Sequence, residues 1–470
     1  MPESTETIVQ RICDEASRRG ASFADARAVE TLADSVLVQD TRANKLFSSA
    51  GFGMCVRVLV DHCWGFASTD TVSPASAAAC LDEAMALARA SARFVEERVE
   101  ITTPQPFVDS VRSVGRMMPD EMPAAEKVRR VMEFEAAGRQ AAGGKIVNSI
   151  VSYSDGRQIE TLANTLGTRI RTETCRSNLV TQMVVSDGKQ LQRAVEHRAI
   201  VGGPELLVDT AADEFSVLAA RKAVDLLSAK KCPAGNFTVI FHPSITGLLV
   251  HEALGHNAEA DAVWAGQSLL EGRMGRQLAC EAVSIIDDST IPGAYGSFRY
   301  DSEGTPSSRR VIIDRGRLVS LLHSLETASK FAVPPNGCAR ADGYESKPIV
   351  RMSNTFMDRG TVPFDEMIRG IDRGIYLQDG HWGYVFVAKG QFICHAGRAN
   401  MIENGRIGEP LRDVSISSMT LDTLQNIDAV GDDFEMKMPG TCGKDGQGAP
   451  TDTGGPHVRV RDIVVGGQEA

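Results

Sequence analysis

Apolar and polar residues alternate with two different periods, one helical and one strand-like, along the first half of the chain. Apolar positions at helical spacing, or alanine-rich stretches, predict helices at residues 1–20, 75–90, 124–142 and 204–228. Gly143 and Gly144 provide an end for the third of these helices. β-branched, partly alternating runs predict strands at residues 35–40, 53–60, 146–153, 159–163, 168–174 and 179–185.

The second half opens with one strand and one helix and then becomes strand-rich. Residues 238–241 are typical of a buried strand, and Ser244 is placed to cap a helix whose apolar positions continue to Leu254. A hairpin is expected at 311–322, and further strand-like runs follow at 376–377, 384–387 and 392–395.

These patterns predict an α+β fold of two domains. A linker at residues 230–235, KKCPAG, separates a mixed α/β domain at 1–230 from a domain at 231–470. We expect the second domain to be dominated by antiparallel sheet and to carry the helix that follows Ser244. At 470 residues the chain is too long for one hydrophobic core, which agrees with this division.

Composition narrows the class of protein. The net charge of −11 comes from scattered acids, with no basic stripe, which argues against direct binding of nucleic acid or of an anionic membrane. No apolar run approaches the length of a membrane span, and residues 1–20 do not resemble a leader peptide. The ten cysteines form no CxxC pair, as expected for reduced thiols. We therefore expect a soluble, cytoplasmic protein.

The strongest chemical signal is the run HEALGH at residues 251–256. Imidazole is a common ligand of zinc and other first-row metals. His251 and His256 are five residues apart, which separates them by about 140° on a regular helix. The pair can share a metal only if the helix widens or ends between them, and a π turn at Gly255 would do this. Two histidines satisfied at a helix end are the simpler alternative, but two imidazoles and a carboxylate on a buried helix are costly without a role.

Glu252 lies beside the first histidine, where a carboxylate can act as a base. It can take a proton from a metal-bound water and give it to a leaving amine. We therefore predict a zinc metallopeptidase in which Glu252 is the catalytic base. No residue is identified by sequence as the donor to the oxyanion, although the candidates are His242, His381, His395 and Tyr384.

A catalytic zinc commonly has three protein ligands, so one remains to be found. Cys442 lies in a glycine-rich segment that lets its thiolate approach another element, with Lys444 nearby. Chemistry alone leaves four other candidates: Cys394, His395, Asp261 and Glu259. The last two follow the histidine pair closely enough to be either ligands or partners of a histidine.

Four stretches of the second half resemble the TldD/PmbA family, microbial metalloproteases once described as modulators of DNA gyrase. They are LVHEALGH at 249–256, YDSEGTP at 300–306, RMSNT at 351–355 and GTCGKDGQ at 440–447. The resemblance implies that His251, His256 and Cys442 bind zinc and that Glu252 is the base. It also implies the TldD type of subunit, since PmbA-type subunits lack the histidine motif.

The resemblance further implies the substrate and the assembly. Family members act on unfolded or flexible peptides inside a closed dimeric cavity, which predicts a homodimer or a heterodimer with a motif-lacking PmbA-type subunit. Strand addition would let such a cavity bind extended peptides through their backbone. Two alternatives stay open: a structural or scaffold metal subunit that needs a partner for activity, and an amidohydrolase acting on non-peptide amides.

Overall fold

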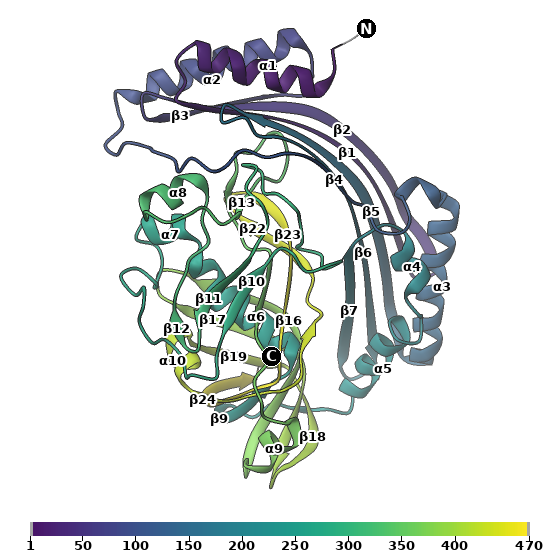
Figure 1. The fold of residues 1–470 in the computed structure, drawn as a ribbon. Helices are drawn as coiled ribbons and strands as arrows, with labels where there is room; N and C mark the ends of the chain where they lie inside the picture. The colour runs from purple at the N-terminus through teal and green to yellow at the C-terminus, as the bar shows by residue number, and fades with distance from the viewer. Residues whose placement is uncertain (1–2, 468–470) are drawn as a thin grey trace.

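The computed structural model describes residues 3–467 as a long curved sheet wrapped around a C-terminal part (Figure 1). The mixed α/β character agrees with the predicted fold class. Among helices of the described residues, none is both long enough and apolar enough to cross a membrane. The division into domains 1–230 and 231–470 stays a prediction.

The curved sheet has seven strands in the order β3-β2-β1-β5-β6-β4, with β7 on β6. Its pairs are antiparallel except β4 with β6. The strands are β1 (Phe23–Gln39), β2 (Arg42–Val60), β3 (Cys63–Thr69), β4 (Val108–Ser113), β5 (Ile146–Asn164), β6 (Arg169–Ser186) and β7 (Leu191–Val201).

Two of these strands are longer than predicted. The predicted strands 146–153 and 159–163 form the single strand β5, because Asp155 in the expected break is buried with its carboxylate 2.8 Å from Lys127 Nζ. The predicted strands 168–174 and 179–185 likewise join in β6, where Arg176 donates to the carbonyls of Tyr295 and Ser297. Long-range contacts therefore keep turn-forming and charged residues within a strand.

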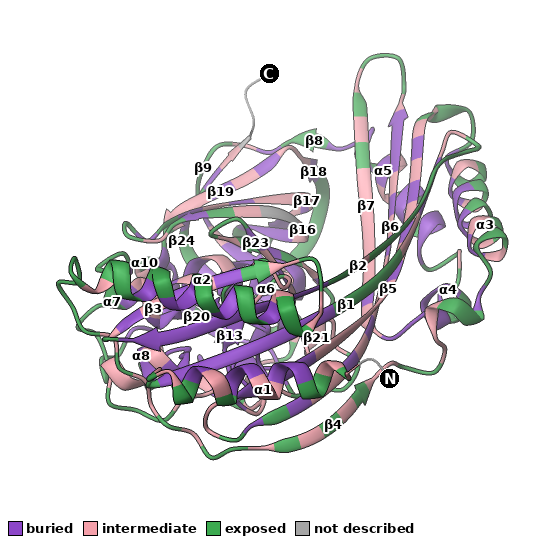
Figure 2. Cartoon of the chain, turned by 90° about the horizontal axis from the view of Figure 1, so that it is seen from above, coloured by how far each residue is buried: buried purple, intermediate pink, exposed green. Residues whose placement is uncertain are grey.

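Helices cover the outer face of the sheet in two groups. One group is α1 (Thr5–Arg18) and α2 (Pro74–Ala92); the other is α3 (Ala124–Ala142), α4 (Glu205–Asp209) and α5 (Ser216–Leu226). In Figure 2 the helices α1 and α2 alternate buried and exposed residues, as amphipathic helices do. The single helix predicted at 204–228 is wrong. Thr210 and Asp213 favour helix poorly, and the chain breaks there before Phe215 enters the core.

The C-terminal part contains two larger sheets and one strand pair. The eight-stranded sheet holds β8 (Lys230–Lys231), β9 (Gly235–Phe241), β16 (Arg373–Phe386), β17 (Gln391–Glu403), β18 (Arg406–Arg412), β19 (Val414–Met419), β20 (Ile427–Val430) and β24 (Val458–Gly467). The seven-stranded one holds β10 (Ile285–Asp288), β11 (Arg309–Asp314), β12 (Arg317–Leu318), β15 (Asn354–Met357), β21 (Glu435–Met436), β22 (Gly440–Lys444) and β23 (Gln447–Gly455). The pair is β13 (Ala339–Arg340) with β14 (Ile349–Val350).

Most pairs of the C-terminal part are antiparallel, as predicted, and β11–β12 is the hairpin expected near residue 315. Its helices are short: α6 (Pro243–Leu249), α7 (Ala260–Trp264), α8 (Leu325–Lys330), α9 (Phe364–Arg369) and α10 (Thr420–Gln425). The main core of this part surrounds α6 and the turns that follow it.

A buried ion pair and a buried hydrogen bond join the curved sheet to the C-terminal part. Arg57 on β2 contacts Asp25 on β1 at 2.5 Å and Glu303 at 2.9 Å. Arg27 on β1 donates to the carbonyl of Ser346 at 2.7 Å. Because Arg57 and Arg27 are buried, removing a partner of either one would leave a buried charge less well compensated. These contacts hold the concave side of the sheet against the part that carries the HEALGH run.

Candidate metal centre

The HEALGH run lies at the end of a buried helix that begins directly after a strand. Strand β9 leads into α6, and the cap is His242, whose Nδ1 accepts from the backbone N–H of Ser244 at 3.2 Å. The predicted cap, Ser244, is wrong by two positions. Pro243 has the backbone conformation of a first helical residue and lacks an N–H, so the helix starts there.

The helix widens at the histidines, as the five-residue spacing predicted. Residues Val250–Gly255 form a π turn. It brings the rings of His251 and His256 to a centroid distance of 5.2 Å at an interplanar angle of 83°. Gly255 permits a close approach at this turn, because a Cβ there would lie 2.0 Å from the Met352 sulfur.

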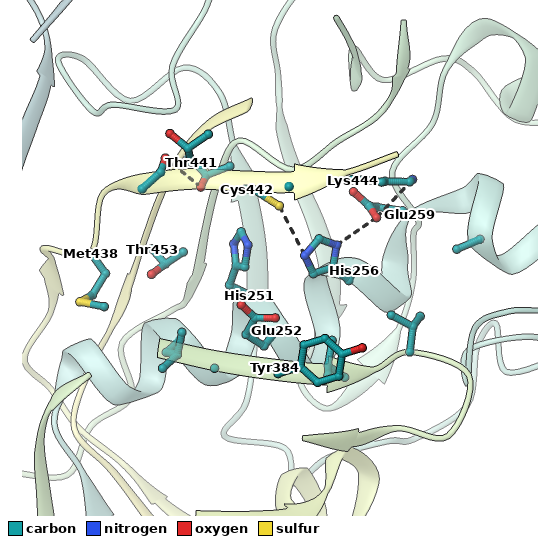
Figure 3. Close-up of a pocket in the computed structure, with 18 of the residues that line it drawn as sticks. His251, Glu252, His256, Glu259, Tyr384, Met438, Thr441, Cys442, Lys444 and Thr453 are labelled. Carbon is teal, nitrogen blue, oxygen red and sulfur yellow. Dashed lines mark hydrogen bonds and ion pairs between the residues drawn. The ribbon is translucent and has the colours of Figure 1, made fainter. Parts of the chain in front are cut away.

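Cys442 reaches the histidines from the other end of the chain. It lies on β22, which pairs with β23 in a hairpin, and its Sγ is 3.4 Å from His256 Nε2 (Figure 3). One potential ligand atom from each of His251, His256 and Cys442 lies within 4.8 Å of the other two. His251 Nδ1 is buried without a hydrogen-bond partner among the described residues. Two imidazoles and a thiol at this separation are a donor set that fits zinc.

The charges of these groups favour metal binding. Burial alone would raise the pKa of the Cys442 thiol, but the neighbouring His251 and His256 outweigh it and lower that pKa to about 4. Burial would lower the pKa of His256, but hydrogen bonds to Cys442 and Glu259 raise it well above its ordinary value. The metal-free site is therefore a thiolate beside an imidazolium, and a cation can replace the proton.

Glu252 lies next to the three potential ligands and lines the same cavity. Burial raises the pKa of its carboxyl group, while the two histidines lower it. On its other side the strand β16 approaches so closely that a Cβ at Gly383 would lie 3.1 Å from Glu252 Cγ. A carboxylate held this way is well placed to exchange protons with a water or a substrate in the cavity.

The alternative third ligands have other partners. Glu259 Oε2 lies 3.2 Å from His256 Nδ1, so it orients this ring from the side away from Cys442. Lys444 Nζ contacts Glu259 at 3.3 Å and both carboxylate oxygens of Asp261 at 2.8 Å. Lys444 thus joins the hairpin to the helix end, a role that its sequence position did not indicate. Cys394 and His395 are outside the group of three.

The three potential ligands line a cavity of about 650 Å³ together with Glu252, Glu259 and Lys444. Strand β22 forms one wall, and the segment of β16 around Tyr384 forms another (Figure 3). Of the four residues predicted as candidates for the oxyanion, Tyr384 lines the cavity, whereas His242 caps α6. The side chain of His381 lies outside the described residues. Sequence patterns missed His197, which reaches the cavity from β7.

Comparison with known proteins places this geometry in a family. Three family models match the chain: PmbA/TldA metallopeptidase domain 1 at residues 24–88, the central domain at 118–230 and the C-terminal domain at 234–467. A metalloprotease of Methanothermobacter thermautotrophicus is 39% identical over 95% of both chains. A zinc metalloprotease TldD homolog of Saccharolobus solfataricus is 28% identical over 96% of this chain and 98% of its own.

Solved structures share the fold. A Thermotoga maritima protein described as a candidate modulator of a DNA gyrase superposes with a TM-score of 0.79 at 23% identity, covering 98% of this chain and 100% of its own. TldE from Thermococcus kodakarensis gives a TM-score of 0.77 at 15% identity, covering 99% and 100% of the two chains. With three matching family models and relatives named metalloproteases over nearly its whole length, the chain belongs to the PmbA/TldD family of metallopeptidases.

Proposed function

We propose that the chain is a zinc-dependent protease that hydrolyses unfolded or flexible peptides. The observation that carries this proposal is the convergence of His251, His256 and Cys442 within 4.8 Å, beside Glu252 in an open cavity. The name of the zinc metalloprotease relative supports the choice of metal. His251, His256 and Cys442 would hold the zinc. When bound, zinc would polarise the scissile carbonyl and make water a better nucleophile at neutral pH.

The chain's own groups would do the rest of the chemistry. The Glu252 carboxylate takes a proton from the attacking water and delivers it to the amine nitrogen that leaves. Glu259 holds the His256 ring through its Nδ1, which leaves Nε2 directed at the Cys442 sulfur. Because Glu252 is partly desolvated, its raised pKa moves it closer to neutrality, where a base can both take and return a proton.

Peptide binding by strand addition fits the walls of the cavity. In the described part of the chain, β22 pairs with β23 alone, so the opposite edge of Gly440–Lys444 has no partner strand, although Arg351 donates to the Cys442 carbonyl. Among the described residues, β16 pairs with β9 only at 374–377, so beyond this point the edge of β16 that faces away from β17 has no partner strand. An extended backbone can pair with such an edge, whereas a folded one cannot, which would favour flexible peptides.

The assembly and the location are also part of the proposal. A neighbour named TldE shares the fold, which supports a partner subunit of that kind or a second copy of this chain. All ten cysteines are free in the structure, as expected in a reducing cytoplasm.

The test compares the parent chain with Glu252→Gln and a matched control, Glu281→Gln, whose side chain is 81% exposed. Zinc content is measured by mass spectrometry, and turnover is measured on an unfolded peptide and on a panel of small amides. We expect one zinc in each protein and a loss of at least about 100-fold in turnover for Glu252→Gln alone. Zinc without peptide turnover in the parent would favour a scaffold subunit, and turnover of small amides alone would favour an amidohydrolase.

A further inference from the structure

One residue of the curved N-terminal sheet takes part in the wall of the metal cavity. His197 lies on β7, whereas the other described residues of the lining come from positions 248–453. A histidine that belongs neither to the metal-binding group nor to the sheets that carry it therefore lines one part of the cavity. A polar side chain in this place is exposed to whatever the cavity binds.

The His197 ring is held in one orientation by its neighbour strand. Its Nε2 lies 2.7 Å from Asn178 Oδ1 on β6, a diagonal neighbour across the antiparallel pair. An amide oxygen only accepts hydrogen bonds, so Nε2 carries the proton and Nδ1 is the acceptor. Burial lowers the pKa of His197 to about 4, which keeps the ring neutral under ordinary conditions. Within the described part of the chain Nδ1 has no hydrogen-bond partner, so it presents an unshared lone pair.

The position of this ring relative to the cavity is also supported. Glu196, the preceding residue, contacts Lys222 Nζ at 2.6 Å, and the same ammonium group contacts Asp379 on β16 at 2.8 Å. Strand β16 carries the Gly383–Tyr384 wall of the cavity. The bridge through Lys222 therefore fixes β7 against the strand that a bound substrate would face.

We propose that His197 is a substrate-binding residue whose Nδ1 accepts a hydrogen bond from a backbone N–H of the peptide in the metal cavity. This inference rests on the proposed protease function and names a contact for that substrate. A neutral acceptor does not bind a carboxylate and does not donate to a carbonyl, so the peptide N–H is the backbone group it fits. The contact would give the N-terminal sheet a direct part in substrate recognition.

The test uses Glu252→Gln protein, which is expected to bind an unfolded peptide without cleaving it. We expect His197→Ala in this background to raise the peptide dissociation constant about tenfold, the effect of one lost hydrogen bond. His197→Gln retains an oxygen acceptor and should lose less. Leu191→Ala, on the same strand and 59% exposed outside the cavity, should bind as the parent does. Zinc content and melting temperature confirm that each variant is folded.

A scan of peptides with one amide replaced by an ester identifies the contact. At one position the ester should weaken binding to Glu252→Gln protein about tenfold. The same ester should not weaken binding further when His197→Ala is added, because both changes remove the same hydrogen bond. Unchanged binding by His197→Ala, or ester losses that stay the same in this variant at every position, would overturn the inference. Zinc-dependent cleavage by the unaltered chain would still support the protease function in that case. Absence of cleavage by the unaltered chain, together with absence of peptide binding by Glu252→Gln, would refute both proposals.

Discussion

The two segments that form the candidate metal site are held by different forces. The helix α6 and its π turn are packed in the main core, and every residue of Pro243–Leu249 is buried. The hairpin strand β22 is more open, because a Cβ at Gly440 or Gly443 would meet no atom within 4 Å. Cys442 itself is buried in the same core, but the rest of the strand is held by polar contacts: Lys444 to Asp261, and Arg351 to the Cys442 carbonyl.

This difference indicates that the two segments have different roles in the site. Close packing determines where His251 and His256 lie, so their geometry needs no metal. The hairpin depends on a few charged hydrogen bonds. Each of these is directional and can break without the others breaking. The hairpin can therefore adjust to a bound ion or peptide, while the helix provides a rigid base.

The largest effect is expected from removing Cys442, the proposed zinc ligand on the hairpin. Cys442→Ala should lose zinc and lower peptide turnover by more than about 100-fold, a larger loss than changing a residue that only hydrogen-bonds a ligand would cause. His251→Ala should do the same from the helix side. The control is Cys280→Ala, a half-buried thiol outside the cavity. Full zinc occupancy in Cys442→Ala, measured by mass spectrometry, would show that Cys442 is no ligand.

A smaller effect is expected from the lysine that joins the two segments. Lys444→Met should weaken zinc binding about 10–100-fold, because Glu259 and Asp261 lose the partner that orients them and the hairpin. The measurement is competition with a chelator of known affinity. Lys437→Met is the matched control, since this lysine is 71% exposed and precedes the hairpin. Equal zinc affinities for the two variants would show that the contacts of Lys444 do not support the metal site.

The packing of the two segments is compared by adding one methyl group to each. Gly255→Ala should destabilise the metal-free protein by about 1–3 kcal/mol, because the new Cβ overlaps the buried Met352 side chain. Gly443→Ala should change the free energy of unfolding by less than about 0.5 kcal/mol, since the site is open. Denaturant midpoints of both variants test this, and similar midpoints would contradict the contrast.

The smallest expected effect is on the pH dependence of Cys442 alkylation. With the pKa of Cys442 lowered to about 4, the thiol of the metal-free protein is ionised above that pH. Alkylation of Cys442 should therefore be nearly constant from pH 6 to 9 and fall only as the pH drops through about 4. Cys338 is the internal control, because burial raises its pKa to about 12 and it should stay unreactive. Peptide mapping after alkylation gives both rates, and a rise of Cys442 reactivity through pH 8.5 would contradict the lowered pKa.

Local patterns in the sequence predicted the helical half of the site well. The strand before α6, the helix itself and the widened turn were all predicted from spacing, because residues within a few positions on a helix meet through its own geometry. The same reasoning failed for the helix at 204–228 and for the breaks inside β5 and β6. In those places contacts with residues distant in the chain outweighed local preference.

The sequence by itself thus determined the fold class, the family and the pair of histidines with its glutamate. It left Cys442 among several candidates on chemical grounds, and only the family resemblance selected it. The tertiary structure decided that its sulfur lies beside His256 although 186 residues separate them, that Lys444 links hairpin and helix, and that His197 reaches the cavity. The physical reason is that helix geometry is a local property, whereas the approach of a strand from elsewhere in the chain depends on the packing of the whole fold.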